Sequence, residues 1–241
     1  MLFRGAASYY ARFRRGYPDE LLDLLADRAG LDGLGRLLDL GCGTGQLAIP
    51  LAARVEEVVA VDAEAEMLEE MDAPPNVRKV HGRAEEVDES WGLFRLVTIG
   101  RAFHWMDGPL VLDRLSRITT QVALVADTVE QSEAQSELLA VARELLGERP
   151  PMKQPMVRYE QALASSAFSD VIELSVEVER TWTPDQLIGY AYSTSFASLR
   201  RVGDRREEFE RELRARLKPH YRERVSVEAV LGRRRDERLE L

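Results

Sequence analysis

The chain has 241 residues, 45% of them hydrophobic and 31% charged, and its formal net charge is −9. This length and composition indicate a globular protein that can bury one sizeable core. One cysteine and three histidines exclude a disulfide framework and argue against a Cys/His zinc cluster, so we predict no metal. The negative charge argues against general affinity for nucleic acid, and no apolar run reaches the roughly 20 residues that span a bilayer. We therefore expect a cytoplasmic protein with neither a nucleic-acid nor a membrane partner.

The first 18 residues carry aromatic and basic side chains ahead of the first predicted helix. One interpretation of this segment is an arm whose aromatic rings pack on the core. The helix predicted next, over 19–29, has leucines at helical spacing and begins after Pro18. We expect it to cover one face of a sheet.

The residues that organise the chain come next. A short apolar run over 36–40 predicts a buried parallel strand, and glycines then occupy every second position, at Gly41, Gly43 and Gly45. A helix is predicted directly after them, over 46–54. Because unpaired backbone N–H groups project from a glycine turn and from a helix N-terminus, this strand end is predicted to bind a polar ligand.

The spacing of the glycines narrows the kind of ligand. A dinucleotide fingerprint requires G-x-G-x-x-G, whereas this turn reads G-x-G-x-G and has Gln46 in place of the last small residue. A phosphate-binding P-loop would end in Gly-Lys-Ser/Thr, and no lysine is near. The lack of basic residues favours a ligand without phosphates, and Asp39 is a candidate partner for its amino group.

A second apolar strand is predicted over 58–62, and it also ends in a carboxylate, Asp62. In this position a carboxylate can accept hydrogen bonds from both hydroxyls of a ribose. The alternative is that Asp62 caps the helix predicted over 63–71, because aspartate is a favoured cap residue.

Together, Asp-Leu-Gly-Cys-Gly-Thr-Gly at 39–45 and Val-Val-Ala-Val-Asp at 58–62 resemble two motifs of the class I S-adenosylmethionine-dependent methyltransferases. The resemblance implies S-adenosyl-L-methionine as the cofactor and an α/β, Rossmann-like, doubly wound sheet. In that family seven strands form a mostly parallel sheet with an antiparallel C-terminal hairpin, and helical insertions lie over the substrate pocket.

The same resemblance implies further cofactor contacts. It adds Ala63 and places Met67 beside the adenine, although a methionine on a helix face is equally typical of plain core. A third strand is predicted over 77–81, after which Ala84 and Glu85 look like the family's adenine-binding turn. The alternative for Glu85 is the start of a solvated helix, where the helix dipole favours an acid.

The arm at 1–18 is similar to the Tyr-x-x-x-Arg-Pro-x-Tyr-Pro leader of a small-molecule subgroup that includes trans-aconitate methyltransferase-like proteins. There the leader folds over the cofactor as a lid. This implies that Arg14 pairs with the cofactor carboxylate and that Tyr17 borders the substrate. Arg15 stands where the subgroup usually has proline, so a less rigid lid is expected.

The candidate reaction site follows a fourth strand, predicted over 96–99, at the same carboxyl edge as the glycine turn. Ala-Phe-His-Trp at 102–105 resembles the same subgroup. It differs from Asn/Asp-Pro-Pro-Tyr/Phe, the signature of enzymes that methylate amino groups of nucleic-acid bases. We therefore expect a small-molecule acceptor and not a nucleic-acid amine.

His104 is the candidate catalytic base, since an imidazole takes up a proton near neutrality. A neutral histidine that shapes the pocket is an equal alternative. Phe103 and Trp105 are expected to form the pocket, where aromatic faces attract a cation by roughly 0.5 to 2 kcal/mol, or to be core. Arg101 is expected to contact the cofactor or the substrate, or to close the strand.

The next elements continue the α/β pattern. We expect a helix over 108–118, a fifth strand over 122–126 and a helix over 132–146 whose inward positions include Leu139. The three prolines within 147–155 predict an irregular stretch.

The last third of the chain is predicted to hold strands over 171–182 and 225–231 and helices over 184–199 and 205–217. The first of these strands alternates polar and apolar residues, so one of its sides should be solvated. Tyr192 and Ser195 fit a partly apolar substrate pocket with hydroxyl groups. A packed helix face is the equal alternative.

We therefore predict one methyltransferase domain over 1–241, made of a lid (1–18), a cofactor-binding core (19–146) and C-terminal strands with helical substrate-pocket insertions (147–241). The expected reaction is in-line methyl transfer to an oxygen, nitrogen or carbon atom, to which proximity can contribute roughly 7 to 11 kcal/mol. An NAD-dependent oxidoreductase and a non-catalytic S-adenosylmethionine-binding protein remain alternatives. Neither the acceptor nor the oligomeric state is predicted.

Overall fold

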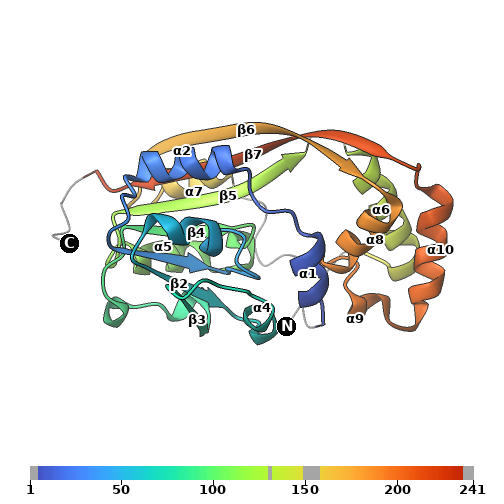
Figure 1. Ribbon diagram of the computed structural model, residues 1–241, viewed down its shortest axis with the longest axis horizontal. Coiled ribbons are helices and arrows are strands. Elements are labelled where there is room, and N and C mark those ends of the chain that lie inside the picture. The colour runs from blue at the N-terminus through green and yellow to red at the C-terminus, as the bar shows by residue number, and fades with distance from the viewer. Residues whose placement is uncertain (1–4, 130–131, 149–157, 236–241) are drawn as a thin grey trace. The chain divides into compact units, whose positions relative to one another are not determined.

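The computed structural model describes residues 5–129, 132–148 and 158–235 (Figure 1). The chain divides into two compact units, which are named here by their content. The sheet unit comprises Gly16–Asp127, Met152–Val176 and Val227–Leu241, and the helical unit comprises Met1–Arg15, Thr128–Pro151 and Glu177–Ser226. Within the described ranges, none of the helices has the length and apolar character that crossing a bilayer requires.

Seven strands form one sheet. They are β1 (Arg36–Leu40), β2 (Glu57–Asp62), β3 (Val77–His81), β4 (Leu96–Gly100), β5 (Gln121–Val129), β6 (Asp170–Trp182) and β7 (Tyr221–Arg233). Their order across the sheet is β3-β2-β1-β4-β5-β7-β6. β1 to β5 pair in parallel, and β6 and β7 form an antiparallel C-terminal hairpin. The predicted Rossmann-like, mostly parallel seven-stranded sheet is thus confirmed.

The strand order locates the place where a ligand can bind. The chain builds β1, β2 and β3 toward one edge and then returns to β4 on the other side of β1. The register sets Leu40 beside Val61 and Asp39 beside Thr98, so the carboxyl ends of β1, β2 and β4 lie together. In open α/β sheets this reversal of strand order marks the ligand crevice.

Different helices cover the two faces of the sheet. On one face, buried strand residues such as Leu38 and Val59 belong to a core shared with α5 (Gly108–Leu115) and α7 (Tyr159–Ala164). Fully burying one such side chain is worth about 1.5–3 kcal/mol. The opposite face carries Asp39, which bonds to α3 (Ala48–Leu51), and α3 packs against α2 (Asp19–Ala29). The predicted helix over 19–29 therefore covers a face of the sheet, as expected.

Short elements complete the sheet unit: α4 (Ala65–Glu69) and the 3₁₀ helices η1 (Ala52–Arg54), η2 (Ala84–Glu86), η3 (Glu89–Trp91) and η4 (Phe103–Trp105). The helix predicted over 46–54 begins only at Ala48, because the glycine turn extends through Leu47. The helix predicted over 63–71 is likewise shortened to α4. The sequence did not predict α7, which follows the proline-rich stretch.

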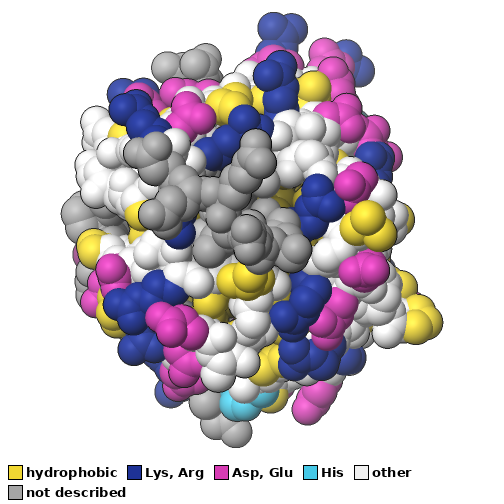
Figure 2. Space-filling model, turned by 90° about the vertical axis from the view of Figure 1, so that its left-hand side faces the viewer, with side chains coloured by type: hydrophobic (Ala, Val, Ile, Leu, Met, Phe, Trp, Pro, Cys, Tyr) yellow, Lys and Arg dark blue, Asp and Glu magenta, His cyan; other side chains and the backbone are white. Residues whose placement is uncertain are grey.

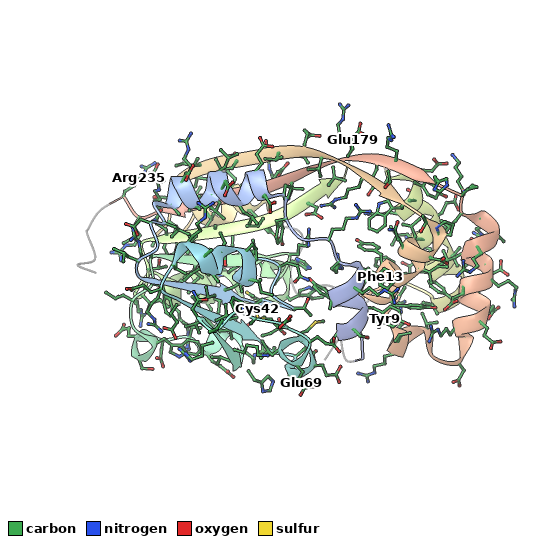
Figure 3. All side chains as sticks on the ribbon, viewed as in Figure 1. Tyr9, Phe13, Cys42, Glu69, Glu179 and Arg235 are labelled. Atoms are coloured by element: carbon green, nitrogen blue, oxygen red, sulfur yellow. The ribbon has the colours of Figure 1, made fainter. Side chains whose placement is uncertain are left out.

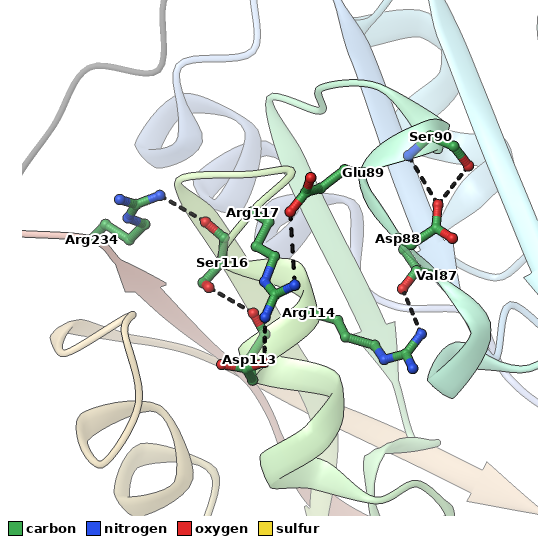
Figure 4. A network of polar contacts seen from close by, with 9 residues as sticks. All are labelled: Val87, Asp88, Glu89, Ser90, Asp113, Arg114, Ser116, Arg117 and Arg234. Atoms are coloured by element: carbon green, nitrogen blue, oxygen red, sulfur yellow. Dashed lines mark hydrogen bonds and ion pairs between the residues drawn. The ribbon is translucent and has the colours of Figure 1, made fainter.

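Polar contacts fasten the segment before β4 and the end of β7 to α5 (Figure 4). The guanidinium of Arg114 donates to the carbonyl of Val87 over 3.2 Å, and that of Arg234 donates to the carbonyl of Ser116 over 2.7 Å. Ser116 caps the C-terminus of α5, where a cation also complements the helix dipole. Arg117 pairs with two acidic side chains, but such exposed pairs contribute little.

The helical unit contains α1 (Ala7–Phe13), α6 (Glu133–Leu146), α8 (Pro184–Tyr192), α9 (Leu199–Val202), η5 (Gly203–Arg205) and α10 (Arg206–Arg216). Its core consists of apolar and aromatic side chains, among them Leu138, Leu187, Tyr192, Phe209 and Leu213. The helix predicted over 205–217 corresponds to α10, and the solvated side predicted for the first late strand is present in β6.

Two predictions in this part of the chain were wrong. Leu139, expected to face inward, is 43% exposed, because the buried stripe of α6 instead includes Leu138 and Val141. The helix expected over 184–199 ends at Tyr192, where α8 ends. Most of the irregular stretch expected over 147–155 lies outside the described residues.

The early end of α8 has a local cause. The hydroxyl of Ser193 donates to the carbonyl of Tyr190, and that of Thr194 donates to the carbonyl of Ala191, each over 2.6 Å. Such side-chain hydrogen bonds offer the backbone an alternative to the next helical turn. A run of hydroxyl residues thus stops a helix that the apolar spacing alone would continue.

α1 docks against α8 through a contact that only glycine permits. A Cβ at Gly189 would lie 2.5 Å from carbon atoms of the Phe13 ring. One turn earlier, the ring of Tyr9 meets that of Tyr192 edge to face at 5.1 Å, and its hydroxyl accepts from Arg206 over 3.1 Å. Figure 3 labels Tyr9 and Phe13 on α1. α1, which lies within the predicted lid, is therefore held by tight packing inside the helical unit.

Candidate functional site

The turn between β1 and α3 depends on glycine. Gly41, Gly43 and Gly45 have φ angles of +65°, +56° and +93°, in the left-handed region that a Cβ disfavours. A Cβ at Gly41 would lie 2.5 Å from the Cβ of Ala102 and 3.1 Å from the Cε of Met106. The structure therefore brings the predicted cofactor turn into direct contact with the segment that carries the predicted reaction residues.

Asp39 lies beneath this turn and is 1% exposed. Its Oδ2 accepts from the backbone N–H of Ala48 over 3.1 Å, and its Oδ1 accepts from the Thr98 hydroxyl over 2.9 Å. Burial raises the pKa of Asp39 to about 7, although both hydrogen bonds favour the ionised form. In this structure the carboxylate ties the turn to α3 and β4, and its predicted partnership with an amino group stays a prediction.

Asp62 lies at the end of β2 and holds the middle of the same turn. Its Oδ2 accepts from the N–H of Gly43 over 2.8 Å, and its Oδ1 accepts from the N–H of Glu64 over 2.9 Å. Burial raises the pKa of Asp62, and these backbone hydrogen bonds oppose the shift. The side chain therefore fixes the turn and the backbone that leads into α4. The predicted role of Asp62 as the helix cap was wrong, because the N-cap of α4 is Glu64 and no side chain caps this helix. Each carboxylate oxygen retains a further lone pair for a ligand hydroxyl, so the other role remains open.

The residues predicted beside the adenine differ in exposure. Met67 and Ala84 are 3% and 7% exposed, so both side chains are largely core, and Ala63 is exposed. Glu85 lies within η2, and its Oε1 accepts from the N–H of Asp107 over 3.1 Å. This bond ties η2 to the residue that caps α5. The predicted contacts of these four residues with a cofactor stay predictions.

The 3₁₀ helix η4 carries the predicted reaction residues. Phe103 is 3% exposed and meets the ring of Tyr159 edge to face at 5.9 Å, so it lies in the core, the second of its two predicted roles. His104 and Trp105 are half-buried, and their ring centroids are 4.7 Å apart. These two rings belong to the segment whose Ala102 and Met106 lie against Gly41.

Arg101 joins the ends of β4 and β5. Its backbone φ is +52°, an uncommon value for a residue with a Cβ and one that often accompanies function. Its guanidinium pairs with Asp127, with 2.6 Å from Nη2 to Oδ1, and lies 4.3 Å above the ring of Tyr17. A Cβ at Gly100 would lie 2.6 Å from the Tyr17 hydroxyl. Tyr17 is thus packed tightly against the end of β4.

The sequence analysis missed two residues of this cluster. Asp127 lies near the carboxyl end of β5, as Asp62 lies at the end of β2, and this repeated pattern was a usable signal. Tyr159 lies on α7, and burial raises its pKa to about 12 while Arg101 lowers it. No motif or spacing in the sequence links Tyr159 to Phe103, because the two residues are 56 positions apart.

Three predicted site residues belong to the helical unit. The guanidinium of Arg14 lies 4.8 Å from the ring centroid of Tyr190. Tyr192 is fully buried and its hydroxyl donates to Glu210 over 2.8 Å, while Ser195 is 6% exposed. The burial of Tyr192 is that of a packed helix face, the alternative foreseen for it, whereas Ser195 lies beyond the end of α8. A role of either residue in binding substrate stays a prediction.

Solved structures with this arrangement of strands and helices define the class of fold. A putative type II methyltransferase from Anaeromyxobacter dehalogenans superposes with a TM-score of 0.58 at 26% identity, covering 92% of this chain and 98% of that one. An S-adenosylmethionine-dependent methyltransferase from Thiobacillus denitrificans, solved with S-adenosyl-L-homocysteine, gives a TM-score of 0.54 at 14% identity, with coverage of 95% and 97%. The second likeness shows the fold alone.

Sequence comparison then gives the family. Residues 37–123 match the model of a methyltransferase domain. An uncharacterized methyltransferase of Mycobacterium tuberculosis is 32% identical over 198 residues, which cover 80% of this chain and 76% of the relative. The chain therefore belongs to the methyltransferase family and is a class I S-adenosylmethionine-dependent methyltransferase.

The residues present fit the cofactor of this class. The turn from Gly41 to Gly45 offers a surface without Cβ atoms at its left-handed positions, and it has no basic side chain of the kind that a phosphate would require. Asp62 adds a carboxylate acceptor one strand away. Among the described residues, no three His, Cys, Asp or Glu side chains gather in a way that could hold a metal ion.

Proposed function

We propose that this enzyme transfers the methyl group of S-adenosyl-L-methionine to a small-molecule acceptor. The observation that carries the proposal is the contact between Gly41 and Ala102, which sets the cofactor turn directly against the segment that bears His104. The bound cofactor supplies an activated methyl group, so the protein has mainly to position two reactants. Such positioning can contribute roughly 7 to 11 kcal/mol.

The geometry of the turn supports the following cofactor-binding roles. Asp62 accepts the ribose hydroxyls, and the backbone from Gly41 to Gly45 lines the amino-acid end of the cofactor. Asp39 acts as a positioning residue, because its buried carboxylate fixes the turn through Ala48 and Thr98. Met67, Ala84 and Glu85 border the adenine, as the family resemblance implies.

The acceptor side is formed by η4. His104 is half-buried beside Trp105, and it takes the proton of a hydroxyl or amine acceptor, whereas a carboxylate acceptor needs no base. A neutral imidazole that only shapes the pocket is the competing role for His104.

Two observations support a small-molecule acceptor. Ala-Phe-His-Trp at 102–105 replaces the signature of enzymes that methylate base amino groups, and the net charge is −9. Binding to a nucleic-acid backbone would favour a broad basic surface. On the face drawn in Figure 2, acidic and basic side chains are instead interspersed.

The test has two stages. Calorimetric titration of the full chain with S-adenosylmethionine, S-adenosylhomocysteine and NAD should show binding of the first two. Turnover to S-adenosylhomocysteine is then measured across small carboxylic acids, phenols and amines, and at least one class should exceed the rate without acceptor. Binding of NAD alone would support an oxidoreductase. Binding of S-adenosylmethionine without turnover on any member of the panel would support a non-catalytic protein.

A further inference from the structure

The two arginines that follow α1 direct their side chains to different aromatic groups of the helical unit. Arg14 caps α1 with an extended backbone, at φ −76° and ψ 114°. In extended backbone, consecutive side chains point to opposite sides. The guanidinium of Arg14 accordingly lies over Tyr10 and Tyr190, and that of Arg15 lies over Trp182.

Arg14 has a donor that the described protein does not use. Its guanidinium lies 5.3 Å from the ring centroid of Tyr10 and 4.8 Å from that of Tyr190. Its Nη1 reaches the Tyr190 hydroxyl only at 3.5 Å. Its Nε is buried, and no described residue accepts a hydrogen bond from it. Burying a charged donor without an acceptor costs free energy, which a bound acceptor would restore.

The aromatic wall beside Arg14 is held rigidly. The rings of Trp182 and Tyr190 lie 5.3 Å apart, and the indole N–H of Trp182 donates to Glu223. The hydroxyl of Ser132 donates to the other oxygen of Glu223 over 2.7 Å. The carboxylate of Glu223 is thereby engaged in fixing the indole, which keeps the wall in place for a ligand.

The surroundings of this wall also favour an anion. Arg180 lies on the same face of β6 as Trp182 and is 7% exposed. Burial lowers the pKa of Arg15, and the positive charge of Arg180 lowers it further, while Glu223 opposes the shift. A negatively charged ligand placed here would relieve this unfavourable environment of the guanidinium.

We propose that Arg14, together with the rings of Tyr10 and Tyr190, binds the carboxylate of a planar aromatic acid that is distinct from the cofactor. A carboxylate can accept two parallel hydrogen bonds from one edge of a guanidinium, including the edge that carries Nε. A flat ring attached to it can stack on the tyrosine rings. The acid is a ligand of the helical unit, and its binding does not depend on the proposed function.

This assignment differs from the role that the family resemblance implies for Arg14, which is to pair with the cofactor carboxylate. The two are separated by working with the full chain saturated with S-adenosylhomocysteine, whose carboxylate already occupies its own site. Benzoate is then titrated and followed by saturation-transfer NMR. Benzoate should bind with a dissociation constant on the order of 1 mM. Benzamide, without the charge, and cyclohexanecarboxylate, without the flat ring, should bind more weakly.

Variants of one helix end provide the matched comparison. Arg14→Gln should weaken benzoate binding at least about tenfold, because a charge-assisted hydrogen bond is lost. The benzoate affinity of Arg14→Lys should lie between those of wild type and Arg14→Gln, because lysine keeps the charge but lacks the planar guanidinium. Arg12→Gln is the control, since Arg12 is exposed on the same helix and its guanidinium lies over Phe13. It should leave benzoate binding unchanged.

S-adenosylhomocysteine affinity, measured on each variant, makes the outcomes separable. Unchanged affinity in Arg14→Gln with lost benzoate binding supports the proposal. Equal benzoate binding in Arg14→Gln and Arg12→Gln overturns it, as does a failure of wild type to bind benzoate. A loss of S-adenosylhomocysteine affinity in Arg14→Gln alone would assign Arg14 to the cofactor. If wild type binds no S-adenosylhomocysteine, the proposed function fails, and the benzoate titration without it still tests this site.

Discussion

The sheet unit and the helical unit use buried charge in opposite ways. At the glycine turn the buried ionisable groups are carboxylates, and Asp39 and Asp62 accept hydrogen bonds from backbone N–H groups. In the helical unit the corresponding group is a guanidinium. The half-buried Arg201 donates to the carbonyl of Gly147 at the end of α6 and to that of Phe196, each over 2.9 Å. The sign of the charge follows from the unpaired backbone groups, which are N–H groups at a turn before a helix and carbonyls after one.

The largest effect should come from filling the glycine turn. In Gly41→Val the new side chain would collide with Ala102 and occupy a left-handed backbone, so we expect cofactor binding to be lost and stability to fall by about 2–4 kcal/mol. Gly30→Val is the control. The φ angle of Gly30 is +68°, but no atom lies within 4 Å of its Cβ position. Gly30→Val should therefore lower stability only through the strained backbone, and by less than Gly41→Val. Calorimetric titration and urea unfolding measure both. Full cofactor affinity in Gly41→Val would contradict the placement of the cofactor.

Removing the side chain of Asp62 and removing that of His104 should affect different quantities, cofactor affinity in the first case and turnover in the second. Asp62→Ala should weaken S-adenosylmethionine binding about 10- to 100-fold, since it removes charge-assisted hydrogen bonds to the ribose and the bond to Gly43. His104→Ala should leave affinity nearly unchanged and lower turnover about 100-fold or more if His104 is a base. Titration together with the rate at saturating cofactor separates the two. Equal affinity losses would show that this division of roles is wrong.

In the helical unit the sensitive position is Gly189. Alanine in a helix interior ordinarily stabilises by up to about 1 kcal/mol over glycine. Here Gly189→Ala should destabilise by about 1–3 kcal/mol, because its Cβ would lie 2.5 Å from the Phe13 ring. Adding Phe13→Ala should remove the clash, so the double variant should be less destabilised than the two single changes together predict. Strict additivity in chemical denaturation would argue against this docking of α1.

The same substitution bears on the lid implied by the family resemblance. If residues 1–18 close over the cofactor, displacement of α1 should also lower turnover. If Gly189→Ala changes stability and leaves turnover intact, α1 is a structural element of the helical unit alone.

A further prediction concerns pH. Burial raises the pKa of Asp39 from an ordinary 3.8 to about 7, so between these values the folded state keeps a proton that the unfolded chain has released. The contribution of Asp39 to stability is therefore greatest below this window and is lost as pH rises through it. Asp39→Asn does not ionise, so its free energy of unfolding relative to wild type should increase from about pH 4 to about pH 8. Thr98→Val keeps the carboxyl group and should keep the slope. A flat difference for Asp39→Asn would contradict the buried carboxyl group.

The sequence was most informative where backbone chemistry is local. The apolar runs and the alternate glycines predicted β1, β2 and the turn, because a buried strand and a left-handed turn restrict residue type directly. For Asp62 the sequence predicted either a ribose contact or a helix cap. In the structure one of its carboxylate oxygens accepts from the N–H of Gly43 and the other from the N–H of Glu64. What could not be predicted depends on distant partners. The carboxylate of Asp39 is buried beside Thr98, which donates a hydrogen bond to it from another strand. Phe103 lies in the core, where Tyr159 of α7 packs against its ring.

Cys42 gives this architecture a built-in reporter. It is the single cysteine of the chain, it lies between Gly41 and Gly43, and it is 5% exposed. Figure 3 labels its position. Burial raises the pKa of its thiol, so a maleimide or an aromatic disulfide reagent can react only when the loop opens. The labelling rate of the unmodified protein therefore measures loop breathing at one known atom, and its slowing by a bound cofactor would report occupancy without any engineered probe.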